Sequence, residues 1–546
     1  MWLRLLLQLS DPSAVSLSFS LNGTEVSVVD DGSSLLDALR EQLGCRSVKD
    51  GCSPQGQCGC CTVWVDGLPR VSCVTAARRV AGRAVTTVEG LADEERRRWT
   101  DAFEATGASQ CGFCTPGIVM RLASLEHRRT KTDDAAVRSA LAAHLCRCTG
   151  WQSIVEAARL ARAPAAPSSA APSRPGRDPV LAAWRAQVEG PAFQSAGAAV
   201  VLGGGGFADD TAPPDAWVAL DAGPGPVGVA PTLMEARRRS GAVPGRNSTA
   251  ALRHPLELPD GEWVVALRTT WVEPAYLEPD ASWCVPGGVP ATPLANGGAF
   301  GGKRRSPLPA LARRLADEHG RAVRVLWSRE TVVRRGPKRP PVALGVRADG
   351  SGILRVARTP GSADLAPLRH AVAAYLPDVT VEEVPVPGPP VAPDVRGAGW
   401  AEAAAAAAVL PLVLAGRTGP GHRVEVRRPG AGRAAVTIDD GGAVRVEVWA
   451  GEVLDAVTLR SYCLGAVHQG LSWVRREGVA TDESGEVQDL TIRSFGILSA
   501  RDTPEVQVVI HPSDCLPVNG SDAVFAAAAA AAWLADGLGQ QWPTRR

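Results

Sequence analysis

The sequence predicts an α+β multidomain protein, in which a small β-grasp domain and a helical bundle precede a larger α+β region. With 546 residues the chain is too long for one hydrophobic core. Strand-like patterns dominate the start of the chain, and helical spacing replaces them at about residue 91. We expect domains at residues 1–90, 91–160 and 181–546, with a linker at residues 161–180.

The first 90 residues carry the signals of strands wrapped around one helix. Asn22 and Gly23 form a dipeptide favoured in two-residue hairpin turns. Ser33 or Ser34 can cap a helix that ends before Gly44. Strands are expected at residues 15–21, 24–29 and 62–65, the last followed by an Asp66-Gly67 turn. This order indicates a β-grasp fold.

The next 70 residues lack strand signals. Apolar residues recur at helical spacing in three segments, at residues 118–125, 135–145 and 154–160. Residues 161–179 are rich in Pro, Ala and Ser and have no apolar period, which predicts an extended linker. Beyond Val180, short β-rich runs mix with Ala-rich ones such as Ala523 to Ala532, and this pattern predicts a large α+β region without repeats.

Composition excludes several classes of partner. Hydrophobic residues make up 45% of the chain, charged residues 21%, and the net charge is +1. No long basic block is present to bind nucleic acid or anionic lipid, and no run of 18 apolar residues could span a bilayer. The opening MWLRLLLQLS is too short for a secretion signal, so a cytoplasmic location is expected.

The first cysteine cluster has the spacing of a plant-type ferredoxin. Its C-x4-C-x2-C pattern and distant fourth cysteine appear here with one extra residue in the first gap. We therefore expect a 2Fe-2S cluster held by Cys52, Cys58, Cys61 and Cys73. Cys60 and Cys45 are interpreted as buried packing thiols. Structural zinc is the alternative, but zinc sites usually pair two short C-x2-C knuckles.

A second set of four thiols lies at the ends of predicted helices. Pro116 suits a helix's first turn, where free N–H groups and the positive dipole end stabilise anionic sulfur. The segments SQCGFCTPG and HLCRCTG supply Cys111, Cys114, Cys146 and Cys148. Spacing alone leaves zinc open at this site.

The paired motifs CGFCTPG and CRCTG carry a resemblance to a known family. Residues 15–160 closely resemble the iron–sulfur part of the molybdenum hydroxylases, the xanthine dehydrogenase and aldehyde oxidoreductase family. The resemblance implies a 2Fe-2S cluster at the second site too. It also implies that Gln110 and the loop around Cys148 lie against the pterin of a molybdenum cofactor, molybdopterin. Electrons would then pass from molybdenum through the helical cluster to the ferredoxin cluster.

Three segments of the large region resemble pieces of the molybdenum subunit of that family. The loop NGGAFGGK, residues 296–303, implies cofactor-binding by Gly298, Ala299, Phe300 and Gly301, with the glycine N–H groups near an oxygen and Phe300 walling the pocket. The segment VRGAGWAEA implies that Arg396 orients substrate. The segment PVNGSDAVFAAAAAAAW places Asp522 where the family has a glutamate base.

The resemblance also bears on partners. No flavin-binding motif is visible, so a separate FAD-binding subunit is expected to take the electrons, which makes the protein a hetero-oligomer. The substrate would be a heterocycle or an aldehyde. Because residues 181–546 are fewer than a full molybdenum subunit has, a non-catalytic electron-transfer or scaffold subunit stays open as an alternative. A cysteine-rich zinc protein is a third possibility, which the ferredoxin-type loop disfavours. The remaining Cys284, Cys463 and Cys515 are expected to be buried thiols.

Overall fold

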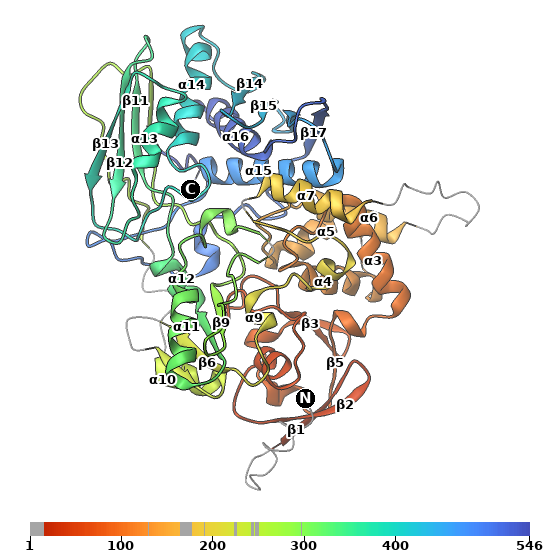
Figure 1. The fold of residues 1–546 in the computed structure, drawn as a ribbon. Coiled ribbons are helices and arrows are strands. Elements are labelled where there is room, and N and C mark those ends of the chain that lie inside the picture. Colours follow the sequence, from red (N-terminus) through yellow and green to blue (C-terminus); the bar gives the residue numbers. More distant parts are fainter. Residues whose placement is uncertain are drawn as a thin grey trace.

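The computed structural model describes residues 16–128, 130, 132–163, 177–190, 192–222, 227–241, 245, 250–295 and 297–545. In Figure 1 the N-terminal strands lie at the lower end of the molecule, helices α3 to α6 lie above them, and the rest of the chain packs along both. The three parts share long interfaces, and these interfaces position the candidate site.

The N-terminal unit is a mixed five-stranded sheet in the order β2-β1-β5-β3-β4. Its strands are β1 Ser16–Leu21, β2 Thr24–Val29, β3 Thr62–Val65, β4 Leu68–Val71 and β5 Ala84–Thr86. Asn22 and Gly23 both have positive φ, as a two-residue turn between antiparallel strands requires. Ser34 caps helix α2, Leu35–Asp37, with a full capping box. The β-grasp prediction is confirmed.

One predicted helix differs in form from the expectation. The segment that begins at α2 continues as a π-helical stretch, Ala38–Gln42, and ends before Gly44, whose φ is positive. Arg40 in that stretch is buried and donates to the carbonyl of Val48 at 2.8 Å. The π-helical stretch therefore contacts the segment that leads to Cys52, the first cysteine of the cluster loop.

Helices form the second unit. They are α3 Asp93–Thr106, α4 Thr115–His127, α5 Asp134–Ala140 and α6 Gln152–Arg162. Helix α3 was not predicted, because its only buried apolar residues are Trp99, Ala102 and Phe103, amid charged ones. Helix α6 extends into the start of the expected 161–180 linker and α7 begins at Pro179, while residues 164–176 of that linker lie outside the described residues.

The third part contains three four-stranded sheets, in the orders β7-β6-β10-β9, β13-β12-β11-β8 and β14-β15-β16-β17. The first consists of β6 Trp217–Asp221, β7 Gly228–Ala230, β9 Ala281–Cys284 and β10 Val323–Trp327. The second consists of β8 Val265–Arg268, β11 Val342–Val346, β12 Gly352–Arg358 and β13 Val379–Pro385. The third consists of β14 Val424–Arg427, β15 Arg433–Ile438, β16 Val444–Trp449 and β17 Val506–His511. Each of these sheets is mixed, with one parallel pair of strands and two antiparallel pairs.

Helices cover these sheets. They are α7 Pro179–Glu189, α8 Ala198–Val201, α9 Ala208–Thr211, α10 Leu233–Ser240, α11 Leu308–His319, α12 Arg329–Arg335, α13 Ala366–Ala373, α14 Trp400–Leu414, α15 Ala456–Arg475 and α16 Ser521–Ala535. The alanine run of α16 is almost fully buried against α14, α15 and strand β15. Small side chains let these helices approach closely: a Cβ at Gly470 would lie 2.8 Å from the carbonyl oxygen of Phe525. Among the residues described, no helix has the length and apolar character needed to cross a membrane.

Buried ion pairs join the N-terminal unit to the third part. Arg40 contacts Asp209 at 2.6 Å and Asp210 at 2.9 Å, and Lys49, whose side chain is fully buried, also pairs with Asp210. Arg324 of β10 binds Asp209 at 3.0 Å. Because paired charges that share partners satisfy one another in a low-dielectric interior, this network fixes the two parts in one orientation.

Candidate redox site

The first cysteine quartet converges from two segments, the loop before β3, which carries Cys52, Cys58 and Cys61, and the turn after β4, which carries Cys73. Cys52 contacts both Cys58 and Cys73, and Cys73 also contacts Cys61. All four are at most 5% exposed. The Cys52 sulfur accepts hydrogen bonds from the backbone N–H groups of Gln57 and Cys58, each at 3.3 Å. Backbone donors aimed at sulfur favour the thiolate form that binds iron.

Cys60, interpreted from the sequence as a packing thiol, lies close to cysteines of both quartets. It is 1% exposed, its Sγ lies 3.9 Å from the carbonyl oxygen of Cys58, and its thiol interacts electrostatically with Cys52, Cys61 and Cys111. It therefore lies between the two cysteine quartets. Burial of Cys60 is confirmed, whereas the prediction fails for Cys515, which is exposed.

The second quartet forms two close pairs. The Sγ atoms of Cys111 and Cys148 are 3.7 Å apart, and Cys114 is hydrogen-bonded to Cys146. Cys146 also lies 3.1 Å from the hydroxyl of Thr149. A 2Fe-2S cluster needs two thiolates on each iron, so paired sulfurs at the N-terminus of α4 and in the loop before α6 suit it.

The two cysteine loops are in direct backbone contact. The N–H of Leu145, the residue before Cys146, donates to the carbonyl of Cys58 at 3.0 Å. A Cβ at Gly117 of α4 would lie within 3.0 Å of the backbone of Cys60, so only glycine allows this approach. The quartets therefore belong to one rigid unit that electrons can cross.

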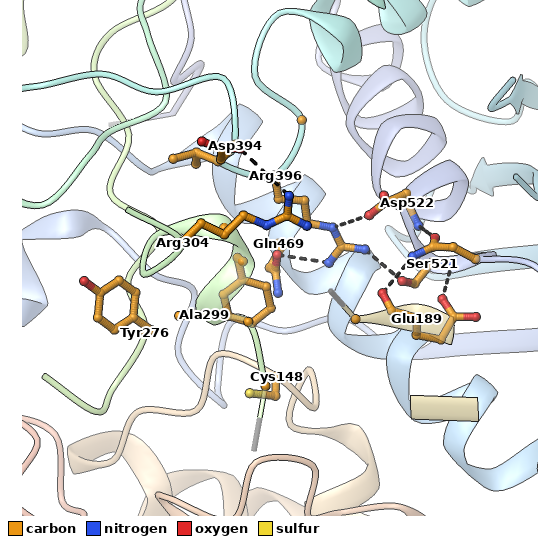
Figure 2. A pocket seen from close by; sticks show the side chains of 18 of the residues that line it. Cys148, Glu189, Tyr276, Ala299, Arg304, Asp394, Arg396, Gln469, Ser521 and Asp522 are labelled. Carbon is orange, nitrogen blue, oxygen red and sulfur yellow. Dashed lines mark hydrogen bonds and ion pairs between the residues drawn. The ribbon is translucent and has the colours of Figure 1, made fainter. Parts of the chain in front are cut away.

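A single cavity of about 600 Å³ gathers the remaining predicted site residues. It is bordered by Gln110, Gly298, Ala299, Phe300, Gly301, Arg396 and Asp522, together with Cys111, Cys114 and Cys148. These residues come from segments more than 400 positions apart in the chain. Figure 2 shows Cys148 and Arg396 among the side chains that line the cavity. A volume of this size suits a cofactor together with a small substrate.

Gln110 joins the helical unit to the large region. Its side-chain amide Nε2 donates to the carbonyl of Cys148 at 2.9 Å and to the hydroxyl of Ser461 on α15 at 3.0 Å. Ser461 in turn donates to the carbonyl of Gly107 at 2.6 Å. The amide is thereby held at the cavity wall beside the second quartet.

The loop at residues 297–302 packs against the loop that carries Arg396. The N–H of Arg396 donates to the carbonyl of Phe300 at 2.9 Å, and both Ala299 and Phe300 have positive φ. The N–H of Gly301 bonds to Gly298 within the turn, so it does not point at a ligand as the sequence interpretation had it. Glycine is required at 301 because a Cβ would overlap the carbonyl of Asp394.

Arg396 and Asp522 are bound to each other. Nε of Arg396 donates to the Asp522 carboxylate at 2.9 Å, and its two terminal nitrogens reach Gln469 at 3.2 Å and Ser521 at 3.0 Å, as Figure 2 shows. Arg428 holds the other carboxylate oxygen of Asp522. Burial lowers the pKa of Arg396 to about 10, which still leaves the guanidinium charged at neutral pH.

Glu189 shapes the same corner from α7. Its carboxylate accepts hydrogen bonds from the backbone N–H groups of Gly520 and Ser521, the shortest at 2.8 Å, and pairs with Arg185. These N–H groups lie at the N-terminus of α16, where the helix dipole favours a negative charge. Glu189 therefore fixes the position of Asp522, and Figure 2 shows it beside Ser521.

The polar groups of the cavity fit a polar, anionic cofactor. The side-chain amide of Gln469 and the guanidinium groups of Arg396, Arg428 and Arg304 are N–H donors, the groups that bind pterin and phosphate oxygens. Both N–H hydrogens of the Gln110 amide are already bound, to Cys148 and Ser461. Lys303 makes no such contact, because it is buried in an ion pair with Glu278 at 2.5 Å.

Several cavity residues were missed from the sequence. Gln469 links Arg396 to the cysteine loop, since its Nε2 donates to the carbonyl of Arg147 at 3.0 Å. Glu189 and Arg428 bind the segment that carries Asp522. Gln469 could have been noticed beside His468 in the segment GAVHQGLSW, residues 465–473, whereas nothing in the sequence indicates Glu189 or Arg428.

Comparison with known proteins agrees with this geometry. Residues 19–81 match the model of the 2Fe-2S iron–sulfur cluster binding domain, and residues 87–159 match that of the [2Fe-2S] binding domain. The nicotinate dehydrogenase small FeS subunit of Eubacterium barkeri is 37% identical over 149 residues, which are 27% of this chain and 94% of that protein. The xanthine dehydrogenase iron-sulfur-binding subunit of Escherichia coli O157:H7 is 42% identical over 127 residues, 23% of this chain and 79% of that protein.

The whole chain resembles solved aldehyde oxidoreductase structures. The enzyme from Desulfovibrio desulfuricans superposes with a TM-score of 0.69 and that from Desulfovibrio gigas with 0.67, each at 15% identity. Both comparisons cover 97% of this chain and 99% of the other chain. At this identity the likeness concerns the fold, and it extends over the large region that the family models do not reach.

Two 2Fe-2S domains joined to this fold define an iron–sulfur oxidoreductase. More specifically, the chain belongs to the molybdenum hydroxylase family of xanthine dehydrogenase and aldehyde oxidoreductase, with its iron–sulfur part fused to a molybdenum-domain-like region.

Proposed function

We propose that this chain oxidises a small heterocycle or aldehyde in the cavity bordered by Arg396 and passes the electrons through both clusters. In this proposal the helical cluster, held by Cys111, Cys114, Cys146 and Cys148, receives electrons first. The ferredoxin cluster, held by Cys52, Cys58, Cys61 and Cys73, receives them next. We retain the domain divisions at residues 90, 160 and 180.

One observation carries the proposal. The cavity wall contains Cys148 and Gln110 from the iron–sulfur part and Phe300, Arg396 and Asp522 from the large region. An oxidation site and an electron acceptor must be close neighbours for electrons to pass between them. A cavity bordered by both meets that requirement.

Molybdopterin is the cofactor we propose for the cavity. Gln110, beside Cys148, and the turn at Gly298, Ala299, Phe300 and Gly301 would border it, and the molybdenum would supply the two-electron oxidation. Arg396 would orient the substrate through its planar N–H groups.

Asp522 would act as the base, but the two arginines that bind its carboxylate restrict when it can accept a proton. A carboxylate between two guanidinium groups is a weak base, since both positive charges stabilise its ionised form. The Arg396 guanidinium is held by three hydrogen bonds, but the Arg428 side chain is 34% exposed and can move. We therefore expect Arg428 to leave Asp522 before the carboxylate takes a proton.

The proposed partner is a separate FAD-binding subunit that accepts electrons from the ferredoxin cluster. Relatives of the iron–sulfur part are named as subunits, among them the 6-hydroxypseudooxynicotine dehydrogenase complex subunit beta of Paenarthrobacter nicotinovorans. A hetero-oligomer of this kind, located in the cytoplasm, is the assembly we propose.

A second candidate function is a non-catalytic electron-transfer or scaffold subunit. It is favoured by the same Asp522 geometry, because a carboxylate fully engaged by Arg396 and Arg428 can be a purely structural group. In that case the cavity would bind no molybdenum.

Metal analysis of anaerobically purified protein tests both candidates. Iron with molybdenum, and reduction of the clusters by an aldehyde or heterocycle, would support the oxidase proposal. Iron without molybdenum, after expression in a host that makes the cofactor, would support the scaffold. Zinc in place of iron would contradict both.

A further inference from the structure

Glu278 is a buried carboxylate that borders two cavities. It lies in the wall of the 600 Å³ cavity and also in that of an interior cavity of about 80 Å³. Its Oε2 pairs with Lys303, whereas Oε1 has no hydrogen-bond partner among the described residues, although Glu278 is only 9% exposed. An unpartnered buried carboxylate oxygen is costly unless water or a proton satisfies it.

The interior cavity leads from Glu278 to Asp280. Asp280 is 1% exposed, accepts a hydrogen bond from the Tyr276 hydroxyl at 2.5 Å, and borders both the interior cavity and an outer cleft of about 610 Å³. Since a water molecule occupies roughly 30 Å³, the interior cavity has room for water between the two carboxylates.

Asp221 borders the outer cleft as well. Its Oδ1 has no partner among the residues that the structure describes, while Oδ2 accepts from Trp327 at 3.2 Å and pairs with Arg335 at 2.5 Å. Glu278 and Asp280 therefore share one cavity, and Asp280 and Asp221 share the next.

We propose that Glu278, Asp280 and Asp221 form the route by which protons leave the oxidation cavity. The inference rests on the proposed function. Oxidation of a C–H bond with water gives C–OH, two electrons and two protons. The electrons pass to the two 2Fe-2S clusters and then to the external acceptor, but the clusters do not carry the protons. Carboxylates and water along connected cavities can carry them to solvent.

Electrostatics supports this role for Glu278. Burial raises its pKa to about 7; Lys303 opposes this shift, and Asp210 and Asp280 add to it. The other charged groups around the interior cavity are Arg40, Asp50, Asp209, Arg237 and Arg329. A group with a pKa near neutrality can both accept and release a proton under physiological conditions.

Difference infrared spectroscopy of the full chain tests the route directly. The wild-type protein should show a carboxylic acid C=O band that titrates near pH 7 and that is missing in Glu278→Gln. After rapid mixing with D2O, Asp280→Asn or Asp221→Asn should slow the deuterium shift of this band by about tenfold. The Asn variants keep the side-chain shape, and Asp221 lies at the outer end, so the two report independently.

Glu402→Gln is the matched control. Glu402 is also buried with a pKa raised to about 7, but it borders neither the interior cavity nor the outer cleft, so its loss should leave the exchange rate of the Glu278 band unchanged. If both Asn variants exchange as fast as wild type, or if no band is lost in Glu278→Gln, the route is wrong. This readout needs no molybdenum, so failure of the route and failure of the oxidase proposal are separate results.

Discussion

Arg396 donates from Nε to the carboxylate of Asp522 at 2.9 Å, and so joins the loop before α14 to the first turn of α16. The same guanidinium reaches Gln469, whose amide donates to the carbonyl of Arg147 between Cys146 and Cys148. The proposed substrate site and the helical cluster are thus connected by three consecutive hydrogen bonds.

Asp522→Asn should abolish oxidation and leave electron transfer intact. The amide keeps the hydrogen-bonding shape but cannot take a proton, so the rate of cluster reduction by substrate should fall by about 100-fold or more. Stopped-flow bleaching of the clusters measures this rate. Reduction by dithionite serves as the control and should not change.

Arg428→Gln should have the opposite effect on the same rate. Without Arg428, Asp522 keeps only one guanidinium partner and becomes a stronger base, so substrate-driven reduction should be faster than in wild type. A rate as low as that of Asp522→Asn would show that Arg428 is itself required for oxidation. It would contradict the expectation that Arg428 leaves Asp522 before the carboxylate takes a proton.

Glu477→Gln should destabilise the loop of the second quartet. Glu477 and Arg147 form a bidentate ion pair with side chains only 1% and 6% exposed, so the variant leaves a buried guanidinium unpaired. We expect a loss of about 3–5 kcal/mol in the free energy of unfolding and a higher reduction potential of the helical cluster. Chemical denaturation and a redox titration followed by electron paramagnetic resonance measure the two effects.

The exposed pair of Arg313 and Asp317 offers the control for that variant. Asp317→Asn breaks an ion pair whose side chains are 43% and 45% exposed, and should change stability by less than about 1 kcal/mol. If Glu477→Gln and Asp317→Asn lowered the free energy of unfolding equally, the claim that burial strengthens the effect at Glu477 would be wrong.

Gly117→Ala should loosen the junction between the cluster domains. A methyl group there meets the carbonyl oxygens of Gly59 and Cys60, and the expected cost is about 1–3 kcal/mol together with slower electron transfer between the clusters. Gly441→Ala, where the nearest atom is a side-chain oxygen of Asp439 at 3.4 Å, is the matched substitution and should be tolerated. Unchanged thermal stability of Gly117→Ala would exclude the tight contact.

Glu402→Gln should change how stability depends on pH. Burial raises the pKa of Glu402 from 4.5 to about 7, so between these values the folded protein holds a proton that the unfolded chain releases. Wild-type stability therefore falls as pH rises through this window. The variant lacks this decline and should be more stable at pH 8 by roughly 1–3 kcal/mol. Urea midpoints at pH 5 and pH 8 measure the difference, which should vanish at the lower pH.

Local signals in the sequence predicted the fold near the clusters. The Asn22-Gly23 turn, the Ser34 cap and the position of Pro116 in the first turn of α4 all depend on neighbours in the chain, and each is found as expected. The π-helical stretch and the charge-rich helix α3 were not predictable, because contacts with distant segments stabilise them.

The site was predictable only in part for the same reason. Motifs pointed to Gln110, Phe300, Arg396 and Asp522, and the fold brings all of these to one cavity. Their partners escaped notice: Glu189 reaches Ser521 from 332 positions away, and no local pattern marks such a pair. Whether a carboxylate is a free base or an ion-pair partner depends on these tertiary contacts and not on its motif.

The central claim is that two 2Fe-2S clusters connect this cavity to an external acceptor. Electron paramagnetic resonance of the anaerobically purified, dithionite-reduced protein tests it most directly, with iron and acid-labile sulfide measured on the same sample. The claim predicts two distinct signals of equal intensity, and loss of only one of them in Cys148→Ser. A single signal, or a colourless protein that contains zinc, would contradict it.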